Sequence, residues 1–276
     1  MNKKLINIAV GTLCIGSSLM AKEPRDSFAL PPLSLKTDIR FDSEYVYRGA
    51  KLGQQVFIPK VELGASLFEK GRFYFGNENF LLVKNSLSNR NDLCVGFSYD
   101  LTDLFTVDGA LTFHLRKSEN ITLNQQGGKK DTKEIYVGLL SNVCWNPSLY
   151  YSYDITWKRH NLEGRLEYPY DLTPLGVEGF AVALRAKAGF DRTNKPLGIK
   201  NSFEPGGRHH GKKKSYAYYG AGIDLVRSFN ENCEGRIGVN YEGTSTKSAW
   251  IHGPSAWLFT VRKNLAWFST SLKWDF

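Results

Sequence analysis

The side chains best suited to acid–base or metal chemistry in this chain are its five histidines, His114, His160, His209, His210 and His252. None of them lies in a nucleophile motif, and the sequence contains no Gly-x-Ser-x-Gly. His252 and Ser255 are near each other in the sequence and could meet in a loop, and this arrangement is the closest one to a hydrolase site. The adjacent pair His209–His210 lacks the cysteine or carboxylate partners of a zinc site. We therefore expect no enzyme, no cofactor and no metal site.

The cysteines and a pair of glycines do not indicate a specific chemistry either. Three cysteines, Cys94, Cys144 and Cys233, follow residue 21, and no pairing among them can be assigned from their positions. Gly220 and Gly222 flank Ala221 inside a strand-like run, without the following helix of a phosphate-binding loop. This glycine pair indicates a bend or a close packing of strands.

A different chemistry is indicated by the stretch 34–49, SLKTDIRFDSEYVYRG. Its odd positions are mostly apolar or aromatic, and its even positions are mostly charged, with both signs present. Successive side chains of a strand point to opposite faces, so this stretch predicts a strand with one ionic face. In a soluble sandwich the charges would meet water outside, whereas in a membrane barrel they would line the interior.

The elements that must position this ionic face are strands, because period-two runs recur from residue 34 to the end of the chain. We count about twelve of them. Their connections are tight at 69–71, 100–103, 141–147, 171–176 and 228–232, and longer at 116–133, 192–215 and 243–255. Short turns at one end and long loops at the other are typical of outer-membrane barrels. The sequence therefore predicts an all-β, antiparallel up-and-down transmembrane β-barrel.

The first 21 residues, MNKKLINIAVGTLCIGSSLMA, have the composition of a cleaved signal peptide, with two lysines, an apolar centre and small residues before the end. Residues 22–33 then form a short periplasmic segment, and residues 34–276 form the barrel. Beyond residue 21 no stretch approaches the roughly 20 apolar residues of a membrane-spanning helix. This excludes a helical membrane bundle and favours a location in the bacterial outer membrane.

The last residues, LAWFSTSLKWDF at 265–276, carry a second export-related pattern. Phe268, Leu272, Trp274 and Phe276 share one face of the predicted strand, and the chain ends on the aromatic ring. This spacing resembles the signal that outer-membrane proteins present to the barrel-assembly machinery. We therefore expect that machinery to be a partner during insertion.

The cost of exposing charge to lipid decides which face is inside. A Lys or Arg at the bilayer midplane costs about 2–4 kcal/mol, so the ionic faces are expected to point into the lumen. The expected lumen-lining residues are Lys36, Asp38, Arg40, Asp42, Glu44, Lys60, Glu62, Asp108, His114, Asp154, Arg185, Lys187 and Arg236. Aromatic girdles at the interfaces, or packing inside the barrel, are expected for Tyr45, Tyr47, Trp157, Trp257, Trp267 and Trp274.

A basic segment at 192–214 carries seven Lys and Arg residues against the single acidic residue Glu204 beyond Asp191. Attraction of anionic solutes to a pore mouth is one interpretation, and contact with lipopolysaccharide phosphates is another. A solvated surface loop is the plain alternative. Export argues against binding of nucleic acid. The residues assigned to this basic outer loop are Lys195, Lys200, Arg208, Lys212, Lys213 and Lys214.

Three stretches occur in the order found in a known family. SEYVYRG at 43–49 resembles the SDYVFRG-type signature of the TorF-like family of bacterial porins, and two later stretches at 92–115 and 134–154 resemble it as well. The basic segment at 192–214 and the three cysteines do not belong to that pattern. Membership would imply an outer-membrane barrel that passes small solutes.

The leading functional hypothesis is a porin-like channel for passive diffusion of small, charged solutes. Eight strands leave an interior filled by side chains and 16 to 18 leave a broad channel, so about twelve predict a narrow lumen. The alternatives are a non-conducting adhesin or structural barrel that acts through its long loops, and an outer-membrane hydrolase. Lipid and lipopolysaccharide are expected partners, and the oligomeric state is left open. The segment 256–267 is either a bulged part of the last strand or part of an outer loop.

Overall fold

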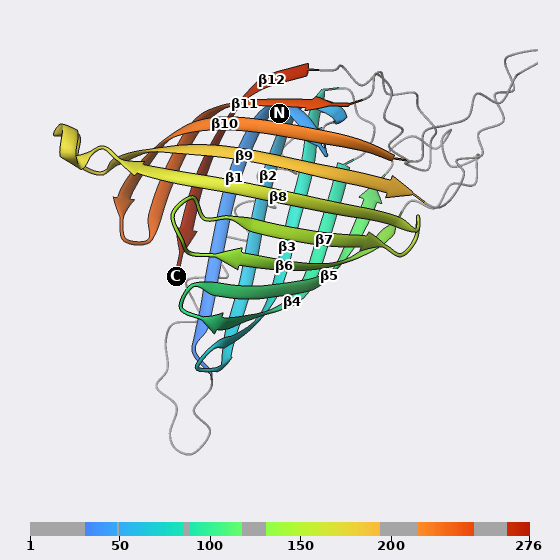
Figure 1. Cartoon of the computed structure of the whole chain (residues 1–276), viewed down its shortest axis with the longest axis horizontal. Coiled ribbons are helices and arrows are strands. Elements are labelled where there is room, and N and C mark those ends of the chain that lie inside the picture. Colours follow the sequence, from blue (N-terminus) through green and yellow to red (C-terminus); the bar gives the residue numbers. More distant parts are fainter. Residues whose placement is uncertain (1–30, 49, 85–88, 118–130, 194–214, 246–263) are drawn as a thin grey trace, which may run out of the picture.

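The computed structural model describes residues 31–48, 50–84, 89–117, 131–193, 215–245 and 264–276. Twelve strands fill these ranges and form one antiparallel sheet closed on itself (Figure 1). The strands are β1 (Leu33–Tyr47), β2 (Ala50–Phe68), β3 (Gly71–Lys84), β4 (Asn89–Thr102), β5 (Phe105–Lys117), β6 (Thr132–Ser141), β7 (Ser148–Asp154), β8 (Arg159–Asp171), β9 (Phe180–Thr193), β10 (Ser215–Asn230), β11 (Cys233–Thr244) and β12 (Asn264–Asp275).

Each strand pairs with its neighbours in sequence, and β1 pairs with β12 to close the barrel. The two closing strands pair from Lys36 opposite Asp275 to Asp42 opposite Ser269. Strands can cross a bilayer only when their backbone groups are paired in this way. Among the described residues, no helix combines the length and apolar character needed to span a membrane. The predicted fold, an up-and-down β-barrel of about twelve strands, is confirmed.

The barrel is apolar outside and polar inside. On β6, Ile135, Val137 and Leu139 are exposed on the outer surface, whereas Glu134 on the other face is buried. The same outward exposure of large apolar side chains recurs on β4, β9, β10 and β11. Water could not stabilise this surface, but the hydrocarbon of a membrane does. The chain is therefore a multi-pass β-barrel of the bacterial outer membrane.

The opening strand has the orientation expected from its charges. Asp38 lies opposite Lys60 of β2 on one side and Lys273 of β12 on the other. The next residue, Ile39, lies opposite Pro59 and Leu272. Directly opposed residues share a face, so the ionic positions of three adjacent strands all point into the lumen while the apolar ones face lipid.

The short turns gather at one end of the barrel. The β8–β9 turn, which contains a short 3-10 helix at Thr173–Leu175, lies with the β10–β11 turn and the C-terminus at the left of Figure 1. Because short turns of such barrels face the periplasm, this end is the periplasmic one. Most of the long connections (118–130, 194–214 and 246–263) and the expected signal peptide lie outside the described residues. Strand β12 begins at Asn264, and residues 256–263 lie outside the described residues.

The C-terminal residue is part of the barrel wall. The Phe276 N–H donates to the Leu35 carbonyl at 2.8 Å, and the Leu35 N–H donates to the Phe276 carbonyl at 2.9 Å. Phe268 and Phe276 are exposed on the outer face. The last strand therefore joins the first along its full periplasmic half, and its role as an insertion signal stays a prediction.

The outward face of β6 provides a test of the membrane orientation. Val137→Arg places a cation in the middle of a lipid-facing strand, so the free energy of unfolding in phospholipid vesicles should fall by about 2–4 kcal/mol. Denaturant titration with a heat-modifiability gel measures this change. Leu175→Arg is the matched control, because Leu175 is exposed in the periplasmic turn. Equal effects of both substitutions would contradict the proposed membrane level.

Candidate functional site: the barrel lumen

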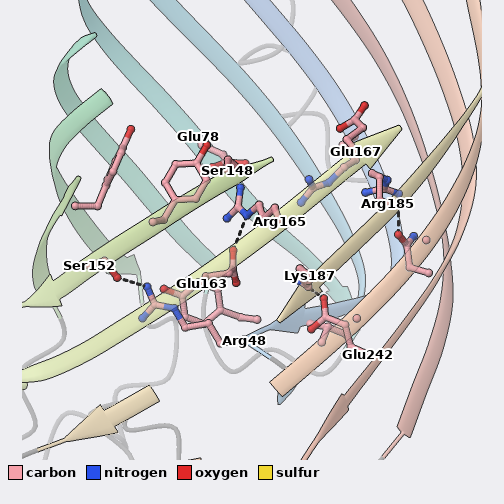
Figure 2. Close-up of a pocket in the computed structure, with 18 of the residues that line it drawn as sticks. Arg48, Glu78, Ser148, Ser152, Glu163, Arg165, Glu167, Arg185, Lys187 and Glu242 are labelled. Carbon is pink, nitrogen blue, oxygen red and sulfur yellow. Dashed lines mark hydrogen bonds and ion pairs between the residues drawn. The ribbon is translucent and has the colours of Figure 1, made fainter. Parts of the chain in front are cut away.

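The lumen contains a cavity of about 1020 Å³. Its lining begins at Asn142 and Asn146 in the periplasmic β6–β7 turn and ends near the outer rim, at Arg48 and Ser152. Figure 2 shows basic and acidic side chains reaching into this space from several strands. The cavity is therefore an ionic chamber that runs most of the length of the barrel.

Seven of the thirteen expected lumen residues lie on the cavity wall, namely Arg40, Asp42, Lys60, Asp108, His114, Arg185 and Lys187. The other six lie on the inner faces of the strands, beside the cavity. Among these, Glu62 accepts from Arg72 Nη2 at 2.8 Å, Arg236 donates to Glu167 at 3.0 Å, and Glu44 forms an ion pair with Lys51. Asp154 accepts from the Trp157 N–H, while Lys36 and Asp38 lie opposite Glu62 and Lys60 of β2.

The outer end of β1 leaves the barrel wall. Pairing of β1 with β12 stops at Asp42 opposite Ser269, and the register with β2 shifts between Tyr45 and Val46. Gln55, in the facing part of β2, has a φ of +50°. Beyond this point four consecutive residues, 45–48, all line the cavity, which an alternating strand cannot do. The tip of the β1–β2 hairpin is thus folded into the lumen.

This fold decides where the two tyrosines of the hairpin lie. Alternation placed Tyr45 and Tyr47 on the apolar face, and interfacial girdles or packing inside the barrel were both expected for them. Tyr45 is buried in the lumen against Val56, Ile58 and Phe80, and Tyr47 also lines the cavity. The bulged register reverses the facing of the strand end, and this is where alternation fails as a predictor. Trp267 also lines the lumen.

Arg48, at the tip of this hairpin, connects three distant strands. Its Nη2 donates to both carboxylate oxygens of Glu134 on β6, at 2.9 and 3.0 Å, and to Ser152 Oγ on β7, at 2.8 Å. Its Nη1 lies 3.9 Å from Asp191 on β9. The partners all lie within a few residues of the outer ends of their strands. Arg48 therefore fastens the folded hairpin across the outer mouth.

A second arginine completes this fastening. Arg159 Nε donates to Asp191 at 2.5 Å and its Nη2 donates to the Tyr216 hydroxyl at 2.9 Å. The same hydroxyl donates to the Arg48 carbonyl at 3.2 Å. Asp191 and Tyr216 are buried, so the centre of the network is shielded from water. We name the set Arg48, Glu134, Ser152, Arg159, Asp191 and Tyr216 the outer latch.

An acidic residue in the middle of the lumen is held by tyrosines. The hydroxyls of Tyr74 and Tyr136 donate to the two carboxylate oxygens of Asp108, each at 2.8 Å. The two hydroxyl oxygens are themselves 2.6 Å apart. Hydrogen bonds to a carboxylate spread its charge over fixed donors, so Asp108 is stabilised in the wall although no basic side chain of the described residues forms an ion pair with it.

No family model matches the sequence, and no curated protein matches it. Several solved structures are similar in fold. A KdgM porin is 8% identical with a TM-score of 0.46, covering 88% of this chain and 99% of its own. LpxR from Salmonella typhimurium is 8% identical (TM-score 0.47; 87% and 99% covered), as is an outer-membrane channel from Pseudomonas putida F1 (TM-score 0.47; 93% and 100% covered). At TM-scores below 0.5 these similarities carry no weight for function.

Several lumen residues were not predicted from the sequence, although the alternation of apolar and polar residues could have identified them. Glu163 and Arg165 alternate with Leu162 and Leu166 on β8, and Glu134 alternates with Ile135 on β6. Arg48 has no such signal, because its position depends on the bulge.

The basic outer loop and the candidates His209, His210, His252 and Ser255 lie outside the described residues. Within the described ranges, no cluster of three or more His, Cys, Asp or Glu is placed to hold a metal ion, and Cys94, Cys144 and Cys233 are unpaired.

The outer latch predicts a strong coupling between Arg48 and Glu134. Arg48→Met leaves Glu134 buried without its guanidinium, so the free energy of unfolding should fall by about 3–5 kcal/mol. Adding Glu134→Gln removes the uncompensated charge and should recover part of this loss. Denaturant titration of the refolded barrel measures both variants. Arg227→Met, at a periplasmic strand end away from the latch, serves as the control. Strictly additive effects of the two latch substitutions would contradict the coupling.

Proposed function

We propose that this protein is a porin-like channel for passive diffusion of small, charged solutes across the outer membrane. The observation that carries the proposal is the cavity of about 1020 Å³, lined by charged side chains, inside a closed barrel. A barrel whose only task is to span the membrane could fill its interior with apolar packing. An ionic chamber that reaches the periplasmic turns instead offers a wet path for polar solutes.

The outer latch sets the size limit of this proposed path. Arg48 and Tyr45 lie where the cavity ends, and the apolar cluster of Tyr45, Val56, Ile58 and Phe80 occupies the lumen beside them. A solute has to pass this narrow level, so we expect small single-channel conductance. The latch residue Arg48 belongs to SEYVYRG, the motif on which we also propose kinship with the TorF-like porins.

The same latch favours a second candidate, a non-conducting barrel that acts through its outer loops. A plugged lumen should hold its inward charges in closed networks, and the Arg48 and Arg159 pairs are networks of that kind. In this case the inner chamber would be a structural feature, and binding would take place outside. Insertion through Phe276 and contact of the basic loop with lipopolysaccharide are proposals common to both candidates.

Planar-bilayer recording of the purified, refolded protein separates the two candidates. A channel should give small, uniform current steps, and Arg48→Ser should enlarge them because it removes the guanidinium from the level at which the hairpin is folded into the lumen. Ser148→Ala, on the cavity wall near the periplasmic end, is a control that should leave the step size unchanged. Silence of both the wild type and Arg48→Ser, in preparations that show a folded, heat-modifiable band, would refute the channel and support the plugged barrel.

A further inference from the structure

One wall of the lumen, formed by β8 to β11, has a gap in its row of side chains. Gly220 of β10 lies between Lys187 of β9 and Glu242 of β11, and Gly222 lies between Arg185 and Asn240. On β8, Arg165 lies directly opposite Lys187. Two inward positions on β10 thus carry no side chain, while basic residues stand on the strands to one side.

The gap is bridged by side chains that cross β10. Lys187 forms an ion pair with Glu242 (Figure 2), and Arg185 Nη2 donates to Asn240 at 2.9 Å. A Cβ atom on Gly220 would lie 2.8 Å from Glu242 Cγ and 3.1 Å from Lys187 Cε. The glycines are therefore needed for this crossing, which explains the close packing expected at residues 220–222.

In these ion pairs the base faces the cavity and the acid lies against the wall. The Arg165 side chain is 55% exposed and its partner Glu163 is 8% exposed. For Lys187 and Glu242 the values are 30% and 3%, and for Arg185 and Asp224 they are 36% and 4%. A solute in the cavity would meet the cations first, although formal charges of the pairs cancel.

The opposite wall has the same order. Lys60 is 42% exposed and its partner Glu62 is 13% exposed, and Arg40 likewise stands further out than Asp42. Asp108 is held by two hydroxyl groups. Glu78 also lies in the cavity wall, and Glu44, Glu167 and Glu234 are about as exposed as their basic partners. In the five pairs compared above, the positive end is thus the one that points toward the axis.

We propose that Arg165, Arg185 and Lys187 form a binding site for phosphate or carboxylate groups, and that this site makes the lumen prefer anions. The inference rests on the proposed channel function and names its solute class. Arg165 bonds Glu163 through Nε alone, at 2.5 Å. Among the described residues its two terminal nitrogens have no hydrogen-bond partner, so they can bind an anionic oxygen pair, for which the guanidinium geometry is suited.

The test removes ion pairs whole, so that the formal charge of the lumen does not change. The variant combines Arg165→Gln with Glu163→Gln and Lys187→Gln with Glu242→Gln. A count of charges predicts no effect, whereas the exposure of the bases predicts a loss of anion preference. The control is Lys273→Gln with Asp275→Gln, because these partners are almost equally exposed, at 46% and 42%. A heat-modifiability gel shows that each variant is folded.

The reversal potential in a KCl gradient measures the preference. We expect the wild type to favour chloride, the four-residue variant to lower the chloride-to-potassium permeability ratio about twofold or more, and the control to keep it. Inorganic phosphate and citrate, added separately, should each reduce the wild-type current more than the variant current. Reduction by one of them alone would identify which anionic group the site takes.

Two results would overturn the inference, and they differ in what they say of the channel. Current steps without anion preference, or a preference that survives in the four-residue variant, would refute the anion site while the channel stands. Absence of steps in folded wild-type protein would refute the channel and the anion preference together.

Discussion

Charge cannot face hydrocarbon, and this constraint organises the barrel. The strands carry Lys, Arg, Asp and Glu along their whole length, so one face of each strand must be enclosed and given water or partners. Closure of β1 on β12 provides the enclosure. Opposition of Asp38 to Lys60 and Lys273 then gives the partners, because residues that face each other across adjacent strands share the lumen.

The same constraint has two outcomes within one lumen. At the outer mouth the arginines are buried with their carboxylates, and Arg48 holds the β1–β2 hairpin inside the barrel. Further toward the periplasm the bases stand in the cavity above buried acids, because Gly220 and Gly222 leave room for side chains to cross β10. In the first region the ion pairs hold the hairpin in place. In the second region they leave hydrogen-bond donors of the basic side chains directed at the lumen axis.

These two regions explain why an ionic chamber and a folded hairpin coexist in one lumen. An apolar cluster around Val56 and Ile58 gives the folded hairpin a small core of its own, so the hairpin is not held by charge alone. The tyrosine pair around Asp108 shows a further way to keep an acid in the wall without a base beside it. The lumen is thus ordered by cross-strand contacts, and its accessible charge differs from its formal charge.

The sequence by itself predicted about twelve strands, their antiparallel order and the inward face of the charged residues. Alternation is a local property of extended chain, and the cost of charge in lipid settles which face is enclosed, as Ile39 and Asp38 illustrate. The sequence could not place Arg48 or turn Tyr45 inward, because both depend on a bulge at which the register of two strands shifts. It also could not show which member of an ion pair reaches the cavity. That depends on neighbours that are distant along the chain, such as Gly220 between Lys187 and Glu242, and only the closed barrel brings them together.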